Sequence, residues 1–110
     1  AYQSYDLFYS MNKDGLKPRI VKIDGGMVAN NWFSQFLADV INTKVIRPKV
    51  LETTALGAAL FAGYQIGEFK SLNQIKNTWK KDKAFKPKIN KKLRNHILHG
   101  WKQAIKKTLA

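Results

Sequence analysis

The sequence has no cysteine, few acidic residues and no long apolar segment. The absence of cysteine excludes disulfides and thiolate metal sites, and we expect a reducing compartment, the cytoplasm. The two histidines lie near no cluster of carboxylates, so we expect no metal site within the chain. No segment approaches the roughly 20 apolar residues of a membrane-spanning helix, so we expect no membrane span. The chain begins with Ala1 rather than methionine, and we expect it to be a piece of a longer protein.

Acidic residues are scarcest in the C-terminal part of the chain. The sequence has 20 basic and 7 acidic residues, and its formal net charge is +13. Residues 1–69 carry 7 basic and 6 acidic side chains, whereas residues 70–110 carry 13 and 1. Nucleic-acid-binding surfaces usually combine such charge with base-stacking aromatics, but Trp79, Phe85 and Trp101 lie at core-like positions. We interpret the excess as a solvated lysine-rich surface and expect no nucleic-acid partner, with a basic nucleic-acid-binding module as an alternative.

The first half of the chain alternates between helical and strand-like patterns. Its 45% content of hydrophobic residues is enough for one core, so we expect a single unit over residues 1–110. The predicted elements are a helix over 2–11 that ends at Gly15, an interior strand over 19–23, a helix over 29–41 that closes at Asn42, and a strand over 44–47 that ends at Pro48. Strand, glycine turn, helix and strand in this order predict an α/β fold.

Small residues dominate the next predicted helix, which covers residues 53–63 and stops at Gly67. Glycine inside a helix costs about 1 kcal/mol relative to alanine, and close packing usually offsets that cost. We therefore expect this helix to pack deep against its neighbours, with Gly57 and Gly63 giving clearance.

Two shorter signals organise the C-terminal part. Ser71 and Gln74 have the spacing of a capping box, which predicts a short helix. Lysines and Pro87 then break the pattern, and Asn90 can cap a final helix. The apolar row of that helix consists of Leu93, Ile97, Trp101 and Ile105.

The turn Asp24-Gly25-Gly26 is the candidate site for chemistry. Because glycine has no Cβ, the backbone there can approach a phosphate or ribose closely, and amides at a helix start favour an anion. Asn30 offers donors and acceptors to a nucleotide, and Asp24 can orient the turn or the water of a bound metal. The turn matches neither the Walker A motif nor the dinucleotide fingerprint, so a glycine turn without a ligand, in a purely structural domain, stays open.

Two motifs carry a family resemblance, namely the glycine turn with its following helix and the small-residue helix. The matching segments are Ile23-Asp24-Gly25-Gly26-Met27-Val28-Ala29-Asn30-Asn31-Trp32, Gln35-Phe36-Leu37-Ala38-Asp39, Arg47-Pro48, Glu52-Thr53-Thr54-Ala55-Leu56-Gly57-Ala58-Ala59, Ala62-Gly63, Gly67 and Gly100-Trp101-Lys102-Gln103-Ala104. Together they resemble the FGGY family of carbohydrate kinases, and within it the members that phosphorylate glycerol. Residues 80–99 depart from the resemblance, because lysines replace a more mixed charge pattern there.

The resemblance implies that residues 1–110 are part of the C-terminal FGGY domain, an actin-like (ribonuclease H-like) ATPase domain that supplies half of a nucleotide site. Gly26 and Asn30 match positions that contact ATP or ADP in the family, and Gly25 lies in the same turn. The cofactors implied are ATP, as substrate, and Mg²⁺. The N-terminal polyol-binding domain, the catalytic base and most magnesium contacts would lie upstream of Ala1.

The same resemblance implies that the full protein transfers the γ-phosphoryl group of ATP to glycerol, giving sn-glycerol 3-phosphate. We expect no catalytic residue in these 110 residues, no activity of the chain alone, and a homo-oligomeric full protein. A related kinase for xylulose or gluconate stays open as an alternative.

Overall fold

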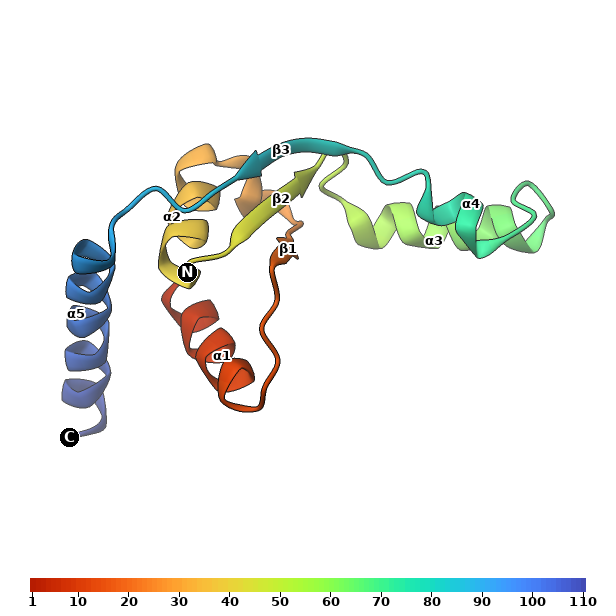
Figure 1. Cartoon of the computed structure of the whole chain (residues 1–110). Helices are drawn as coiled ribbons and strands as arrows, with labels where there is room; N and C mark the ends of the chain where they lie inside the picture. The colour runs from red at the N-terminus through yellow and green to blue at the C-terminus, as the bar shows by residue number, and fades with distance from the viewer.

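The computed structural model describes all 110 residues and combines helices with one small sheet (Figure 1). The elements are α1 (Tyr2–Lys13), β1 (Ile20–Lys22), the 3-10 helix η1 (Gly26–Ala29), α2 (Asn31–Ile41), β2 (Lys44–Pro48), α3 (Thr53–Gln65), α4 (Leu72–Lys76), β3 (Lys81–Phe85) and α5 (Lys91–Leu109). The α/β prediction is confirmed, and all five predicted helices and both predicted strands are present within a few residues of their expected bounds.

The sheet has the order β1-β2-β3, with β1 parallel and β3 antiparallel to the central strand β2. The strand at β1 was expected in the interior of a sheet, and this is wrong for the present chain. It lies at an edge, where the side chain of Ile20 is 52% exposed. Pro48 ends β2, where the pairing with β3 is irregular, and a missing amide donor is tolerated at such a place.

The sequence did not predict β3, and its composition explains why. Lys81 and Lys83 point their charged side chains to solvent, and only Phe85 at its end is buried. Lysines on an edge strand protect the exposed backbone from pairing with other chains, but they hide the strand from any search for apolar alternation. Phe85 confirms the expectation that this aromatic residue belongs to the core.

The core forms where α2 lies on the sheet. Leu37, Ala38 and Ile41 of α2 pack with Val45 of β2 and Phe85 of β3. The helix predicted over 29–41 is thus confirmed. Its apolar row is only partly buried, because Leu37, Val40 and Ile41 are buried whereas Trp32 is 70% exposed. The helix also closes as predicted, because Asn42 takes the left-handed conformation with a φ of 53° and donates its backbone N–H to Ala38 O.

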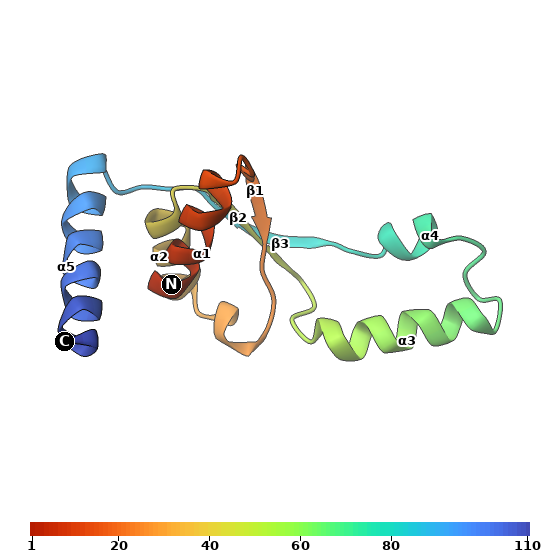
Figure 2. The same cartoon turned by 90° about the horizontal axis from the view of Figure 1, so that it is seen from below.

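The chain is extended beyond this core. Its radius of gyration is 17.4 Å, whereas a compact domain of this length has about 13 Å. The α3–α4 arm, residues 53–76, projects away from the sheet in both views (Figures 1 and 2). Only α4 makes extensive contact with α3.

The α3–α4 arm corrects one prediction. Deep packing of α3 is wrong within this chain, since α3 has no buried residue and Phe61 and Ile66 are exposed. A Cβ at Gly57 would meet no atom within 4 Å, so that glycine gives no clearance here. Gly63 does give clearance, because a Cβ there would lie 2.9 Å from the ring of Phe69. The physical reason is that α3 packs mainly on α4, a helix of only 5 residues, and the rest of its surface is left uncovered in this chain.

The predicted caps of the last two helices are confirmed. Ser71 Oγ accepts a hydrogen bond from the backbone N–H of Gln74 at 3.3 Å, and Gln74 Oε1 accepts one from Lys70 N at 2.7 Å. Asn90 Oδ1 accepts from Leu93 N at 2.7 Å and so caps α5. The apolar row predicted for α5 is only partly right, because Leu93 is exposed.

Helix α5 is anchored to α1 through Trp101. Its ring stacks on Tyr2 with centroids 5.2 Å apart, and its Nε1 donates to Asp6 Oδ2 at 2.9 Å. Leu98 is the one buried residue of α5. None of the helices combines the length and apolar character that crossing a bilayer requires.

Candidate functional site

The glycine turn joins β1 to η1 and is fixed by the conformation of its first glycine. Gly25 has φ 92° and ψ 165°, a region that essentially only glycine adopts. Its backbone N–H donates to Leu51 O at 3.1 Å, which ties the turn to the β2–α3 connection. Asp24 makes a second tie, because its carboxylate accepts a hydrogen bond from the hydroxyl of Thr53 at the start of α3. The carboxylate of Asp24 is thus engaged within the chain.

Asn30 lies at a different place in the local structure from the one expected. The helix expected over 29–41 would include Asn30, but η1 comes first and α2 begins at Asn31. Asn30 is the N-cap of α2, and its Oδ1 accepts from Phe33 N at 3.1 Å. The reason is that an asparagine side chain satisfies one of the free amides at a helix start better than helical backbone would. Its side-chain NH₂ group donates no hydrogen bond within the chain.

The turn presents open backbone on its outer side. A Cβ built on Gly25 or Gly26 would meet no heavy atom within 4 Å, and Met27 beside them is exposed. The backbone N–H groups of Gly26 and Met27 have no acceptor in the turns, loops and caps of the chain. Such a surface can donate hydrogen bonds to an anion or to a ribose that approaches closely. Gly25 and Gly26 therefore lie on one accessible turn, and Asn30 follows at the far end of η1.

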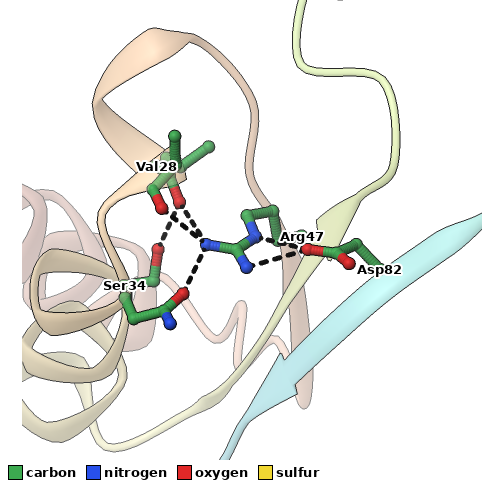
Figure 3. A network of polar contacts seen from close by, with 6 residues as sticks. Val28, Ser34, Arg47 and Asp82 are labelled. Carbon is green, nitrogen blue, oxygen red and sulfur yellow. Dashed lines mark hydrogen bonds and ion pairs between the residues drawn. The ribbon is translucent and has the colours of Figure 1, made fainter.

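Arg47 on β2 binds the end of η1, the short helix that follows the turn, and the sequence had given it no role. Its Nη1 donates to three acceptors (Figure 3): Val28 O at 2.9 Å, Ala29 O at 3.0 Å and Asn31 Oδ1 at 2.9 Å. The side chain is buried, with Arg47 only 8% exposed overall. A charged residue directly after Val45 and Ile46 was the available signal, because a cation in a buried strand must have partners.

Two more side chains complete the network around Arg47 (Figure 3). Asp82 on β3 accepts from Arg47 Nε at 2.9 Å and forms an ion pair with Nη2 at 2.8 Å. Ser34 on α2 donates its hydroxyl to Val28 O at 2.9 Å. The turn is thus connected to α2, β2 and β3 by polar contacts.

The turn borders only a small hollow of the surface, about 120 Å³, at Asp24. The largest, about 700 Å³, is lined by Trp32 and by lysines of β2, β3 and the segment after it. Gly25, Gly26 and Asn30 line none of the hollows of the chain. No group of three or more His, Cys, Asp or Glu side chains is arranged to hold a metal ion. The two glycines of the turn are therefore open surface rather than part of an enclosed pocket.

Comparison with known proteins identifies the family to which this turn belongs. The model for the C-terminal domain of the FGGY family of carbohydrate kinases matches residues 1–66, which include the turn, α2 and α3. The chain belongs to the FGGY family of carbohydrate kinases. Its sheet and helices are accordingly part of the actin-like ATPase domain of that family, as predicted.

Individual FGGY relatives match nearly the whole chain. Glycerol kinase of Gluconobacter oxydans is 46% identical over 110 residues, which cover 99% of this chain and 22% of the relative. A crystal structure of Plasmodium falciparum glycerol kinase with ADP matches with a TM-score of 0.80 and 34% identity, over 99% of this chain and 22% of that one. The xylulose kinase of Lactobacillus acidophilus matches with a TM-score of 0.65, over 84% of this chain and 19% of that one, at 23% identity, which supports the fold alone.

The FGGY chain described here spans about 22% of the length of the glycerol kinases that it matches. The network of Arg47 and the open turn thus lie in a segment that matches only part of each of those kinases. Exposed apolar side chains such as Phe61 on α3 and Ile20 on β1 are consistent with that proportion.

Proposed function

We propose that this chain is the C-terminal, nucleotide-binding part of a glycerol kinase. The full protein transfers the γ-phosphoryl group of ATP to glycerol, giving sn-glycerol 3-phosphate and ADP. The observation that carries the proposal is the match to the glycerol kinase solved with ADP, which extends over 99% of the chain at 34% identity. Sequence identity of 46% to a second glycerol kinase supports the same substrate.

Within this proposal, Gly25, Gly26 and Asn30 bind the nucleotide. Gly26 offers an approach free of side-chain atoms, and its backbone N–H is available to an acceptor on the ligand. The side-chain NH₂ of Asn30 provides a second donor, while its Oδ1 is used by the cap of α2. Gly25 contributes through its conformation, which creates the turn.

Magnesium does not fit the residues of this chain. The carboxylate of Asp24, nearest to the turn, already accepts the hydroxyl of Thr53, and no further acidic side chain stands beside it to complete a ligand set. We therefore assign no magnesium contact to these 110 residues. The ATP–Mg²⁺ complex of the full kinase would take its protein ligands from residues outside this segment.

The chain alone is inactive in this proposal. Phosphoryl transfer depends on positioning both substrates and stabilising charge, and two domains that close over a nucleotide supply both. The open turn is one wall only, and no hollow here joins it to a place for glycerol. The exposed apolar side chains of Phe61 on α3 and Ile66 just after it are surface that the remainder of the kinase would cover.

The direct test measures ATP-dependent phosphorylation by the full-length protein and by the 110-residue chain. We expect the full-length protein to phosphorylate glycerol with far higher kcat/KM than xylulose or gluconate, and the chain to have no activity. Preference for xylulose or gluconate would contradict the glycerol assignment while keeping the FGGY family. Phosphorylation of glycerol by the 110-residue chain would contradict its proposed role as one half of a site.

The cytoplasm and a homo-oligomeric state belong to the same proposal. A kinase that consumes ATP needs the ATP pool of the cell interior, and fractionation of cells tests that location. The mass of the native full-length protein in solution, measured by light scattering, tests the oligomer, and a monomeric mass would contradict it.

A further inference from the structure

We infer that Arg47 positions the nucleotide-binding turn and thereby sets the affinity of the kinase for ATP and ADP. Arg47 itself contacts no nucleotide in this account, and it acts through the backbone that carries Gly26 and Asn30. The inference rests on the proposed function, and it goes further because it assigns nucleotide affinity to a side chain of the sheet.

The contacts of Arg47 converge on the end of η1. The carbonyls of Val28 and Ala29 point out of the last turn of that short helix, where no intrahelical partner is available. A guanidinium group there satisfies both carbonyls and places positive charge at the negative end of the helix. Asn30 follows Ala29 directly, so the position of its side chain depends on how these carbonyls are held.

The other side of the guanidinium is fixed to the sheet. Asp82 binds Arg47 through both Nε and Nη2, at 2.9 and 2.8 Å, and the ring of Phe85 lies 5.3 Å from the guanidinium carbon. The planar group is therefore held in one orientation. It fixes the end of η1, and with it the turn, relative to β2 and β3. A lysine at this position has a single point charge and cannot hold both sides at once.

A second arginine of the chain provides a matched control. Arg94 donates its Nε to Asp39 O at 2.6 Å and its Nη2 to Ile89 O at 3.2 Å. Like Arg47, it joins two segments through backbone carbonyls, but it connects α2 to the start of α5 and makes no contact with the turn. Its replacement reports the general cost of losing a guanidinium from this fold.

The test uses the full-length kinase with Arg47→Lys, Arg94→Lys and Asp82→Asn variants. Calorimetry measures the Kd for ADP, and steady-state kinetics measure KM for ATP and for glycerol. We expect Arg47→Lys to raise both nucleotide constants about tenfold while KM for glycerol changes less than twofold. Arg94→Lys should change none of these constants by more than twofold. Asp82→Asn should raise the Kd for ADP at least threefold, because it frees the guanidinium group from the sheet.

A rise of less than threefold in the Arg47→Lys variant, an equal rise in Arg94→Lys, or an equal rise in KM for glycerol would overturn the inference. If Arg47→Lys does not fold, Asp82→Asn decides, since Asp82 is half exposed and its replacement is nearly isosteric. A threefold or greater rise in its Kd for ADP supports the inference, and a smaller one overturns it. A wild-type enzyme that binds no ADP would overturn the proposed function and this inference together, whereas normal wild-type binding with unaffected variants overturns only the role of Arg47.

Discussion

Replacement of Gly26 by valine separates nucleotide binding from stability. The backbone of Gly26 is not in the left-handed region, and a Cβ there would meet no atom of the chain within 4 Å. The variant should therefore fold with a stability change of no more than about 0.5 kcal/mol, as for an ordinary surface substitution. The branched side chain would instead occupy the space through which the nucleotide approaches. We expect the apparent KM for ATP of the full-length kinase to rise at least about tenfold, or about 1.4 kcal/mol.

The neighbouring glycine gives the opposite result and serves as the matched control. Gly25 has φ 92° and ψ 165°, where any side chain is strained by about 1–3 kcal/mol although the space is open. Gly25→Ala should therefore lower the midpoint of thermal unfolding, whereas Gly26→Val should leave it nearly unchanged. A substitution at Gly25 would thus change mainly the stability of the protein, and one at Gly26 mainly the KM for ATP.

The assay is steady-state kinetics with ATP and glycerol varied in turn, combined with thermal unfolding of each variant. Equal rises in the KM values for ATP and glycerol in Gly26→Val would refute the reasoning, because the side chain would then disturb the enzyme as a whole. A large loss of stability in the same variant would refute the claim that the space beside Gly26 is open.

Three further substitutions in the full-length kinase test the packing around the site. Phe85→Ala removes a core ring and should cost about 3–5 kcal/mol, so an unchanged thermal midpoint would contradict the core placement of β3. Trp101→Phe keeps the stacking on Tyr2 but loses the hydrogen bond to Asp6, and should cost about 1.5–3 kcal/mol; additivity with Asp6→Ala in a double-mutant cycle would argue against that bond. Asn42→Ala should lower the free energy of unfolding by about 1–2 kcal/mol, because alanine is strained at φ 53°. Asn42→Gly should change it very little, because glycine adopts this φ freely. Equal free energies of unfolding for the two variants would show that the helix ends differently.

Local sequence signals predicted the elements of this chain well. The helix over 29–41 and the caps at Asn90 and Ser71 depend on residues a few positions apart, and each is confirmed. By contrast, β3 depends on pairing with β2, and the lysines that suit an edge strand conceal it. The exposed face of α3 was not predictable either, because glycine spacing indicates that a helix can be approached closely but not which chain supplies the neighbour.

The assignment of Gly25, Gly26 and Asn30 to a nucleotide site stays a prediction, and its geometry was only partly predictable. The glycines form the expected turn, but η1 follows it and places Asn30 at the cap of α2. Arg47 was overlooked because its polar partners come from three different elements, η1, α2 and β3. Long-range polar contacts of this kind are indicated in a sequence only by a charged residue at a position that is expected to be buried.

Hydrogen–deuterium exchange of the full-length kinase with and without ADP tests the central claim most directly. The N–H groups of Gly26 and Met27 have no acceptor in the turns, loops and caps of this chain, so they should exchange rapidly in the free enzyme. A nucleotide bound at the turn should slow exchange in the peptide that covers residues 24–30, while peptides of α5 remain unchanged. If ADP binds and residues 24–30 exchange at the same rate as before, the turn is not part of the nucleotide site.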